Sequence, residues 1–346
     1  MTGRNLKSVD DLIAAELLPE NARERLSAVG RRYAVALTPT VADLIDRNDP
    51  ADPIARQFLP SPEELQLTPD ELGDPIGDGA HTPVPGIVHR YPDRVLLKVI
   101  GVCPVYCRFC FRREMVGPDG DGNLTRAQIE NAMDYIRHTP GIWEVILTGG
   151  DPLVMSPRRL REVADLLAGI DHVKILRLHS RVPAVDPEKI DQAMIEALKA
   201  SGKTIYLALH ANHPLEITPA VRAACARLAD AGVTLVSQSV LLKGVNDDAA
   251  VLGALMRAFV EARVKPYYLH HPDMAPGTSH FRLTIAEGQA IMRTLRATVS
   301  GLCLPAYILD LPGGHGKVAL GEDNVRALAD GRYEIRDRAG DPRLYP

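Results

Sequence analysis

The 346-residue chain contains no run of apolar residues that approaches the roughly 20 needed for a membrane-spanning helix. Its N-terminal stretch scatters acids among the apolar positions, so it lacks the uninterrupted apolar core of a secretory signal. Basic residues are not in excess: 40 Lys and Arg against 44 Asp and Glu give a net charge of −4, which argues against a general nucleic-acid-binding surface. We therefore expect a cytoplasmic protein with neither a membrane nor a nucleic acid as its partner.

Cysteine is scarce and unevenly distributed. There are five cysteines, an odd number, and three of them fall between positions 103 and 110. A disulfide framework would not cluster its cysteines in this way, so in a reducing compartment these thiols indicate a metal or redox site. The other two, Cys225 and Cys303, are expected to be buried apolar residues. Hydrophobic residues at 46% and charged residues at 24% are ordinary globular values, which excludes a disordered or coiled-coil chain.

From about residue 92 onward, apolar β-rich runs alternate with amphipathic helical runs. The expected strands are 94–102, 144–148, 174–179, 204–210, 234–240, 266–270 and 306–310. The expected helices are 126–138, 157–168, 187–200, 219–231, 248–262 and 285–299. This alternation predicts an α/β fold of parallel strands joined by helical crossovers. Because polar residues regularly follow the strands, where a barrel has its active site, we expect a partial (β/α) barrel; a doubly wound open sheet is the alternative.

The two ends of the chain are expected to differ from this region. Residues 1–85 are predicted to form an N-terminal extension with short helices at 9–18, 22–35 and 40–47. The Pro-rich and acid-rich connector at 49–85 is expected to be loop rather than core. Residues 86–318 then form the barrel, and residues 319–346 form a short C-terminal tail.

The clustered thiols directly follow the first predicted barrel strand. Cys103, Cys107 and Cys110 have the spacing C-x3-C-x2-C. Three thiolates on one short loop can bind three irons of a cubane iron–sulfur cluster and leave the fourth iron open to another ligand. A closed zinc site is the alternative, and it needs a fourth protein ligand. The candidates for that ligand are His89, His138 and His179.

This loop, placed after the first strand, resembles that of the radical S-adenosylmethionine (SAM) enzymes. The resemblance implies a [4Fe-4S] cluster whose open iron binds the amino and carboxylate groups of SAM. One electron from the cluster then cleaves SAM to methionine and a 5′-deoxyadenosyl radical, which takes hydrogen from an unactivated C–H bond. Gly149, Gly150 and Asp151 end the second strand and resemble the family's glycine motif beside SAM, with a plain strand-to-helix turn as the alternative.

A glycine-rich loop precedes a lysine near the C-terminus, in the segment Gly313-Gly-His315-Gly-Lys317. A lysine on the rim of a barrel can form a Schiff base, and a phosphate-binding loop is the alternative, although the P-loop spacing is not present. Together with the cysteine loop, this segment resembles the lysine 2,3-aminomutase family, which uses both SAM and pyridoxal 5′-phosphate (PLP). The resemblance implies that Lys317 is the catalytic, PLP-binding lysine. His315 stands where the family usually has glycine, a difference that matters if the loop needs a positive φ there.

The same resemblance assigns the other PLP-binding residues to a segment just before the first strand. Arg90, Tyr91 and Arg94 would bind PLP, with the two arginines on its phosphate. Guanidinium groups suit phosphate oxygens, and surface salt bridges are the alternative role.

Other assigned residues follow the strands. The resemblance places Gln238 and His210 near SAM, and it assigns Arg112 to the substrate carboxylate. The neighbouring Arg113 is expected to be a solvated charge.

Two acids bear on the choice of substrate. Asp273 and Asp310 coincide with the aspartates that receive the far ammonium of lysine in the family. A buried ammonium needs paired negative charge, and two carboxylates in a site with Arg112 would suit an amino acid with a cationic end. A helix N-cap or loop role is the alternative for each acid.

These matches imply L-lysine 2,3-aminomutase activity: SAM- and PLP-dependent radical migration of the amino group from C2 to C3, giving β-lysine. A cellular one-electron reductant such as flavodoxin or ferredoxin would be a partner, and a homo-oligomer is possible. The chain has 29 residues after Lys317 and no cysteine among them, so we expect no counterpart of the C-terminal zinc segment of longer family members.

Several other functions stay open. The short length resembles the bacterial branch that makes (R)-β-lysine for modifying elongation factor P, and another amino acid could be the substrate. Outside this family, the alternatives are an iron–sulfur electron carrier or zinc-binding interaction protein, and a PLP enzyme of polar chemistry.

Overall fold

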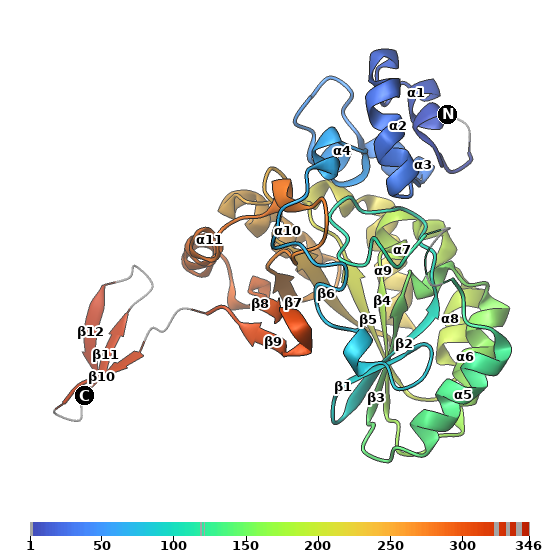
Figure 1. Cartoon of the computed structure of the whole chain (residues 1–346). Helices are drawn as coiled ribbons and strands as arrows, with labels where there is room; N and C mark the ends of the chain where they lie inside the picture. The colour runs from blue at the N-terminus through green and yellow to red at the C-terminus, as the bar shows by residue number, and fades with distance from the viewer. Residues whose placement is uncertain are drawn as a thin grey trace.

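Nine strands form one curved sheet in which each strand pairs with the next along the chain (Figure 1). The computed structural model describes residues 3–117, 120, 122–321, 325–329, 333–336 and 341–345. The strands are β1 (Ile87–Tyr91), β2 (Arg94–Ile100), β3 (Glu144–Gly149), β4 (Ile175–Ser180), β5 (Thr204–His210), β6 (Thr234–Val240), β7 (Lys265–His270), β8 (Ala306–Leu311) and β9 (Gly316–Ala319). Strands β2 to β8 are parallel, and β1 and β9 add an antiparallel strand at either edge. The sheet is therefore a nearly closed, barrel-like α/β structure, and all seven predicted strands are confirmed within two residues at each end.

Helices cover the outer face of this sheet (Figure 1). They are α5 (Arg126–Arg137), α6 (Pro157–Ala168), α7 (Val182–Val185), α8 (Gln192–Lys199), α9 (Pro219–Asp230), α10 (Ala249–Glu261) and α11 (Ile285–Thr298). Local chemistry explains where several of them begin. Thr125 forms a capping box with Gln128 at the start of α5, and Ser156 caps α6 ahead of Pro157 at its first position.

One expected helix is interrupted. The segment predicted as 187–200 consists of a 3₁₀ turn, Pro187–Lys189, and then α8. Between them, the side chain of Asp191 accepts a hydrogen bond from the Met194 amide and starts a new helix. The apolar residues keep a helical spacing on both sides of Asp191, so the sequence predicted a single helix although the capping residue divides it.

The N-terminal residues form α1 (Val9–Ala14), α2 (Arg23–Arg32), α3 (Pro39–Leu44) and α4 (Pro53–Phe58), grouped beyond one end of the barrel (Figure 1). The expectation that residues 49–85 contribute no core was wrong. Ile54, Phe58, Gln57 and Glu64 are at most 2% exposed. Prolines and acids do not reveal whether a segment lies on the surface or against the barrel, and here Asp52 and Pro53 begin helix α4 inside the expected loop.

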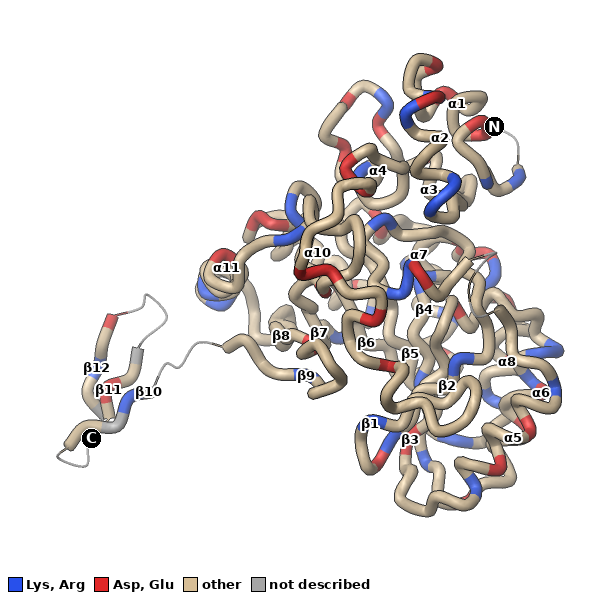
Figure 2. Tube along the Cα trace, viewed as in Figure 1, with Lys and Arg blue, Asp and Glu red and all other residues tan. Residues whose placement is uncertain are grey.

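At the other end of the chain, β10 (Val325–Ala327), β11 (Tyr333–Arg336) and β12 (Pro342–Tyr345) form a small antiparallel sheet to one side of the barrel (Figure 1). Figure 2 shows Lys and Arg interspersed with Asp and Glu over the helices, as the small net charge predicts. Among the residues that the structure describes, no helix is both long and apolar enough to cross a membrane.

Candidate active site

The barrel encloses a cavity of about 650 Å³, which lies within the usual size range of small-molecule sites. Its lining comes from the cysteine loop, from the ends of the parallel strands and from the lysine loop. The predicted site residues that line it are Arg90, Tyr91, Arg94, Cys103, Cys107, Cys110, Arg112, Gly149, Gly150, Asp151, His210, Gln238, Asp273, Asp310 and Lys317. All of the residues that the sequence assigned to one site therefore border one space.

The three clustered cysteines follow β2, as expected, and all are free thiols. Burial, together with the carboxylate of Asp151, raises the pKa of Cys103 well above its usual value. Burial also raises the pKa of Cys107, and it raises that of Cys110 to about 11. In the described part of the chain, no three His, Cys, Asp or Glu side chains lie close enough together to surround a single metal ion. A cubane cluster does not require the three thiolates to surround one ion, because each thiolate binds a different iron.

The two glycines at the end of β3 lie against the start of the cysteine loop. Gly149 has a φ of +109°, and the Gly150 amide donates to the carbonyl of Ile100 at 2.6 Å. A Cβ atom at Gly150 would lie 2.3 Å from the carbonyl oxygen of Val102. Glycine is therefore required here because two backbone segments touch, which fixes the cysteine loop against β3.

Asp151 is bonded to the chain itself. Its carboxylate accepts from Ser180 Oγ at 2.8 Å and from the amides of Arg181, Leu153 and Val182 at 2.6, 3.0 and 3.2 Å. Burial raises the pKa of Asp151, and these hydrogen bonds oppose that rise. The side chain joins the end of β3 to the turn after β4.

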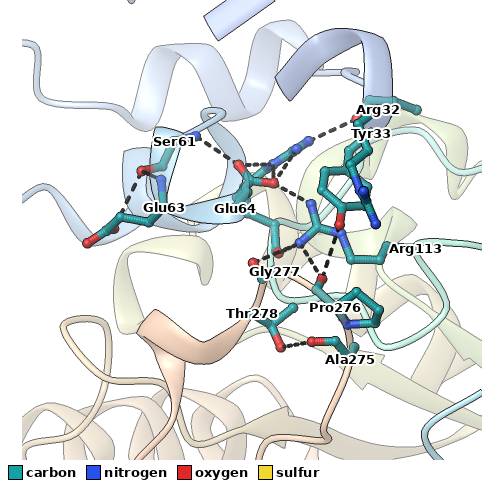
Figure 3. A network of polar contacts seen from close by, with 12 residues as sticks. Arg32, Tyr33, Ser61, Glu63, Glu64, Arg113, Ala275, Pro276, Gly277 and Thr278 are labelled. Carbon is teal, nitrogen blue, oxygen red and sulfur yellow. Dashed lines mark hydrogen bonds and ion pairs between the residues drawn. The ribbon is translucent and has the colours of Figure 1, made fainter. Parts of the chain in front are cut away.

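Figure 3 shows a second polar network, which joins the cysteine loop to the N-terminal extension. Glu64 is completely buried and pairs with both Arg108 and Arg113. Arg113 also donates to the carbonyl of Gly277 at 3.1 Å, and its guanidinium lies 3.5 Å from the centre of the Tyr33 ring. The expectation that Arg113 is a solvated charge was wrong, because a buried carboxylate from a distant segment compensates it.

Lys317 lies on β9, directly opposite Asp310 on β8. Its ammonium group forms an ion pair with the Asp310 carboxylate, and its backbone amide donates to the Tyr91 hydroxyl at 2.9 Å. The loop before it takes positive φ at Gly313, Gly314 and Gly316. His315 instead has a φ of −73°, so the non-glycine residue occupies the loop position where L side chains are unstrained.

The predicted phosphate-binding arginines differ in their surroundings. Arg90 donates to Asp78 Oδ1 at 3.1 Å and lies 3.8 Å from Asp310 Oδ1, and its own Nε is buried without a hydrogen-bond partner. Arg94 stacks on the Tyr91 ring at 3.8 Å and donates to Asp93 at 2.7 Å.

Arg112 shares Asp78 with Arg90. Its Nη2 donates to Asp78 Oδ2 at 3.0 Å, and its Nη1 contacts Thr148 Oγ1 at 3.3 Å. Burial alone would raise the pKa of Asp78, but Arg112, with Lys98 and Arg90, holds that pKa below its usual value. Asp78 was missed by the sequence analysis because an acid in a loop of Pro and Gly carries no periodic signal.

The two acids assigned to substrate recognition share the cavity. Burial and the negative charge of Asp310 raise the pKa of Asp273 to about 7, although Lys317, Arg112 and Arg282 oppose that rise. His270, which the sequence analysis did not single out, lies 3.7 Å from Asp310, and burial together with Lys317 keeps the pKa of its imidazole well below the usual value. Its position at the end of a parallel strand was the available signal.

The two residues assigned to the SAM region lie side by side on neighbouring strands. His210 on β5 and Gln238 on β6 are register partners. The His210 ring lies 5.9 Å from the Phe109 ring of the cysteine loop, and its Nε2 is buried without a partner. Burial and the charge of Arg181 keep the pKa of His210 well below its usual value. Outside the site, Cys225 and Cys303 are buried, as predicted.

Comparisons with known proteins identify the family of the chain. The radical SAM superfamily model matches residues 97–252, from β2 into α10. L-lysine 2,3-aminomutase of Clostridium subterminale is 39% identical over 335 residues, which cover 97% of this chain and 80% of the relative. L-lysine 2,3-aminomutase of Escherichia coli is 38% identical over 314 residues, covering 90% of each chain. Glutamate 2,3-aminomutase of Clostridioides difficile is 36% identical over 315 residues, covering 91% of this chain and 74% of the relative.

The radical SAM superfamily implies an iron–sulfur cluster and SAM, and the free Cys103, Cys107 and Cys110 on one cavity-lining loop would provide the thiols for the cluster. The similarity extends over nearly the whole chain, from the N-terminal helices to the lysine loop. The chain belongs to the lysine 2,3-aminomutase family of the radical SAM superfamily and is an aminomutase, an isomerase.

Proposed function

We propose that the protein is a PLP-dependent L-lysine 2,3-aminomutase. The observation that carries the proposal is the pair Asp273, which is half-buried, and Asp310, which is buried; both line a cavity that also holds Arg112 and Lys317. Burial, and after it the negative charge of Asp310, raises the pKa of Asp273, so a cation bound beside the two carboxylates would stabilise their charged forms. The side-chain ammonium of lysine is such a cation.

Arg112 would bind the carboxylate end of the substrate. Its guanidinium lines the cavity and is held from behind by Asp78, which is 1% exposed. A guanidinium fixed in this way directs its remaining N–H groups to one side. Two coplanar N–H groups match the two oxygens of a carboxylate. Asp78 thus orients the arginine without meeting the substrate.

Asp310 has two tasks in this proposal. In this structure it pairs with the ammonium of Lys317. With Lys317 engaged by PLP, Asp310 would be available, together with Asp273, to a second cation, the side-chain ammonium of the substrate.

The residues around Lys317 fit a phosphorylated aldehyde. Arg90 has a buried Nε without a partner, which indicates an incomplete set of hydrogen bonds in the ligand-free site. Arg90 and Arg94 would hold the phosphate, and Tyr91 fixes the backbone of Lys317. Bound PLP would supply the carbon–nitrogen double bond across which the amino group migrates, and the cluster with SAM would supply the radical. The barrel wall around the cavity would exclude water while radicals persist.

Glutamate is the competing substrate, because a relative of similar identity is a glutamate 2,3-aminomutase. A second carboxylate on the substrate would meet Asp273 and Asp310 with like charge, which favours lysine. The test is an anaerobic assay with SAM, PLP and a reductant, in which L-lysine and L-glutamate are supplied separately and the β-amino acid is resolved by chiral chromatography. We expect turnover of L-lysine; turnover of L-glutamate alone would refute the proposal. Asp310→Asn should lose lysine turnover while still binding iron.

A further inference from the structure

Arg181 is a buried cation in direct contact with a cysteine-loop sulfur. It follows β4, at the start of α7, and it is 5% exposed. Its Nη1 lies 3.3 Å from Cys107 Sγ, with the geometry of a hydrogen bond. No role assigned above to the cysteine loop uses this contact.

Side chains from three other segments fix the guanidinium in place. Its Nη2 donates to Glu216 Oε2 at 2.5 Å and to Gln57 Oε1 at 2.8 Å. The rings of Phe58 and Phe109 lie 4.6 and 5.6 Å from its central carbon. A guanidinium held on one edge by acceptors and flanked by aromatic rings keeps its Nη1 directed at the sulfur.

The groups that hold Arg181 are themselves fixed. Glu216 Oε1 accepts the backbone amides of Asn212 and His213 at 2.8 and 3.0 Å. The backbone carbonyl of Gln57 accepts the amide of Arg108, the residue after Cys107, at 2.8 Å. The ion pair of Arg181 and Glu216 is therefore held in a fixed position, and its positively charged member contacts the Cys107 sulfur.

We infer that Arg181 is a positioning residue that raises the reduction potential of the cluster bound through Cys107. Reduction from the 2+ to the 1+ state adds one electron from the one-electron reductant and no proton. The reduced cluster carries one more negative charge, so a fixed cation at a ligand sulfur stabilises it more than the oxidised cluster. Hydrogen bonds to ligand sulfurs and local charge are the established means by which proteins set such potentials. This inference depends on the cluster and is independent of the amino acid substrate.

The test is a redox titration of the reconstituted protein, followed by EPR of the reduced cluster, in the absence of SAM and substrate. The main variant is the double replacement Arg181→Met with Glu216→Gln, which avoids leaving a buried carboxylate unpaired. We expect the reduction equilibrium to fall on the order of tenfold, which is about 59 mV lower for a one-electron couple. The matched control is Arg227→Met, since Arg227 donates to the carbonyls of Ile190 and Pro187 on the outer helices. Its midpoint should equal that of the wild type.

A double variant with a full iron content and an unchanged or raised midpoint would overturn the inference. A double variant that folds, as judged by circular dichroism, yet binds no cluster would also overturn it, because Arg181 would then be purely structural. If the double variant does not fold, Arg181→Lys decides. Lysine keeps a positive charge beside Glu216, but it lacks the second N–H group that would reach the Cys107 sulfur at the same time. A midpoint potential lower than that of the wild type therefore supports the inference, and an unchanged midpoint potential overturns it.

Discussion

Replacing Gly150 by alanine should detach the cysteine loop from β3. The added Cβ would lie 2.3 Å from the carbonyl oxygen of Val102 and 2.6 Å from its amide nitrogen. Both contacts are with backbone atoms, which cannot rotate away as a side chain could. Gly150 is not among the positive-φ glycines, so alanine can adopt its backbone conformation and the change tests space alone.

The expected cost follows from this overpacking. Inserting a methyl group into packed structure costs about 1–3 kcal/mol, and contact with rigid backbone places this site near the upper value. At roughly 2 °C per kcal/mol for a chain of this size, the melting temperature should fall by about 6 °C. Because the displaced Val102 immediately precedes Cys103, we also expect the variant to bind less than half of the wild-type iron after anaerobic reconstitution.

Thermal melts and iron analysis check both expectations. Gly169→Ala is the matched control, because Gly169 ends α6 at a φ of −78° and its new Cβ would meet nothing closer than 3.9 Å. That variant should melt and bind iron like the wild type. If Gly150→Ala also retained full iron and the wild-type melting temperature, the close approach of β3 to the cysteine loop would not exist as described.

Three further predictions concern the lysine end of the cavity. Lys317→Ala should abolish the visible absorbance of lysine-bound PLP while leaving the iron content unchanged; a retained band would refute its assignment. Since burial and Asp310 raise the pKa of Asp273 from 3.8 to about 7, the folded protein holds a proton there that the unfolded chain releases, and the ligand-free protein loses stability as the pH rises from about 4 to about 7. Asp273→Asn should therefore raise the melting temperature more at pH 8 than at pH 5, and an equal rise at both would contradict the shift. Arg282 donates to Glu71 at 2.7 Å and to the carbonyl of Ala275 at 2.9 Å, close to Asp273. The double replacement Arg282→Met with Glu71→Gln, which avoids leaving the buried Glu71 carboxylate unpaired, should raise KM for lysine several-fold with little change in kcat, as expected for the loss of about 1 kcal/mol of positioning hydrogen bonds, and an unchanged KM would count against it.

The barrel strands could be predicted from the sequence because each is an apolar run between helical patterns that have clear caps. The edge strands β1 and β9 could not. β1 (Ile87–Tyr91) carries His89 and Arg90 in its short length, and β9 (Gly316–Ala319) begins with the glycine beside Lys317. Both pair with an existing barrel strand in antiparallel register, and such pairing depends on tertiary neighbours rather than on a local pattern.

The main cavity residues could be predicted because spacing and family resemblance mark them, but the side chains that hold them could not. Glu64, Asp78 and Glu216 lie in segments without periodicity, and each is at most 2% exposed in the folded protein. An acid in a Pro-rich loop is expected to be solvated until its partner is known. Each of these acids has a partner arginine that lies 34 to 49 positions away. Burying such acids is costly unless their charge is compensated, so each one indicates an arginine that the fold holds in a fixed direction. In this protein those arginines are Arg112, Arg113 and Arg181, and two of the three line the cavity wall. The burial of these acids becomes visible only in the folded structure, and it explains why the arginines are held rigidly. No sequence motif encodes that rigidity.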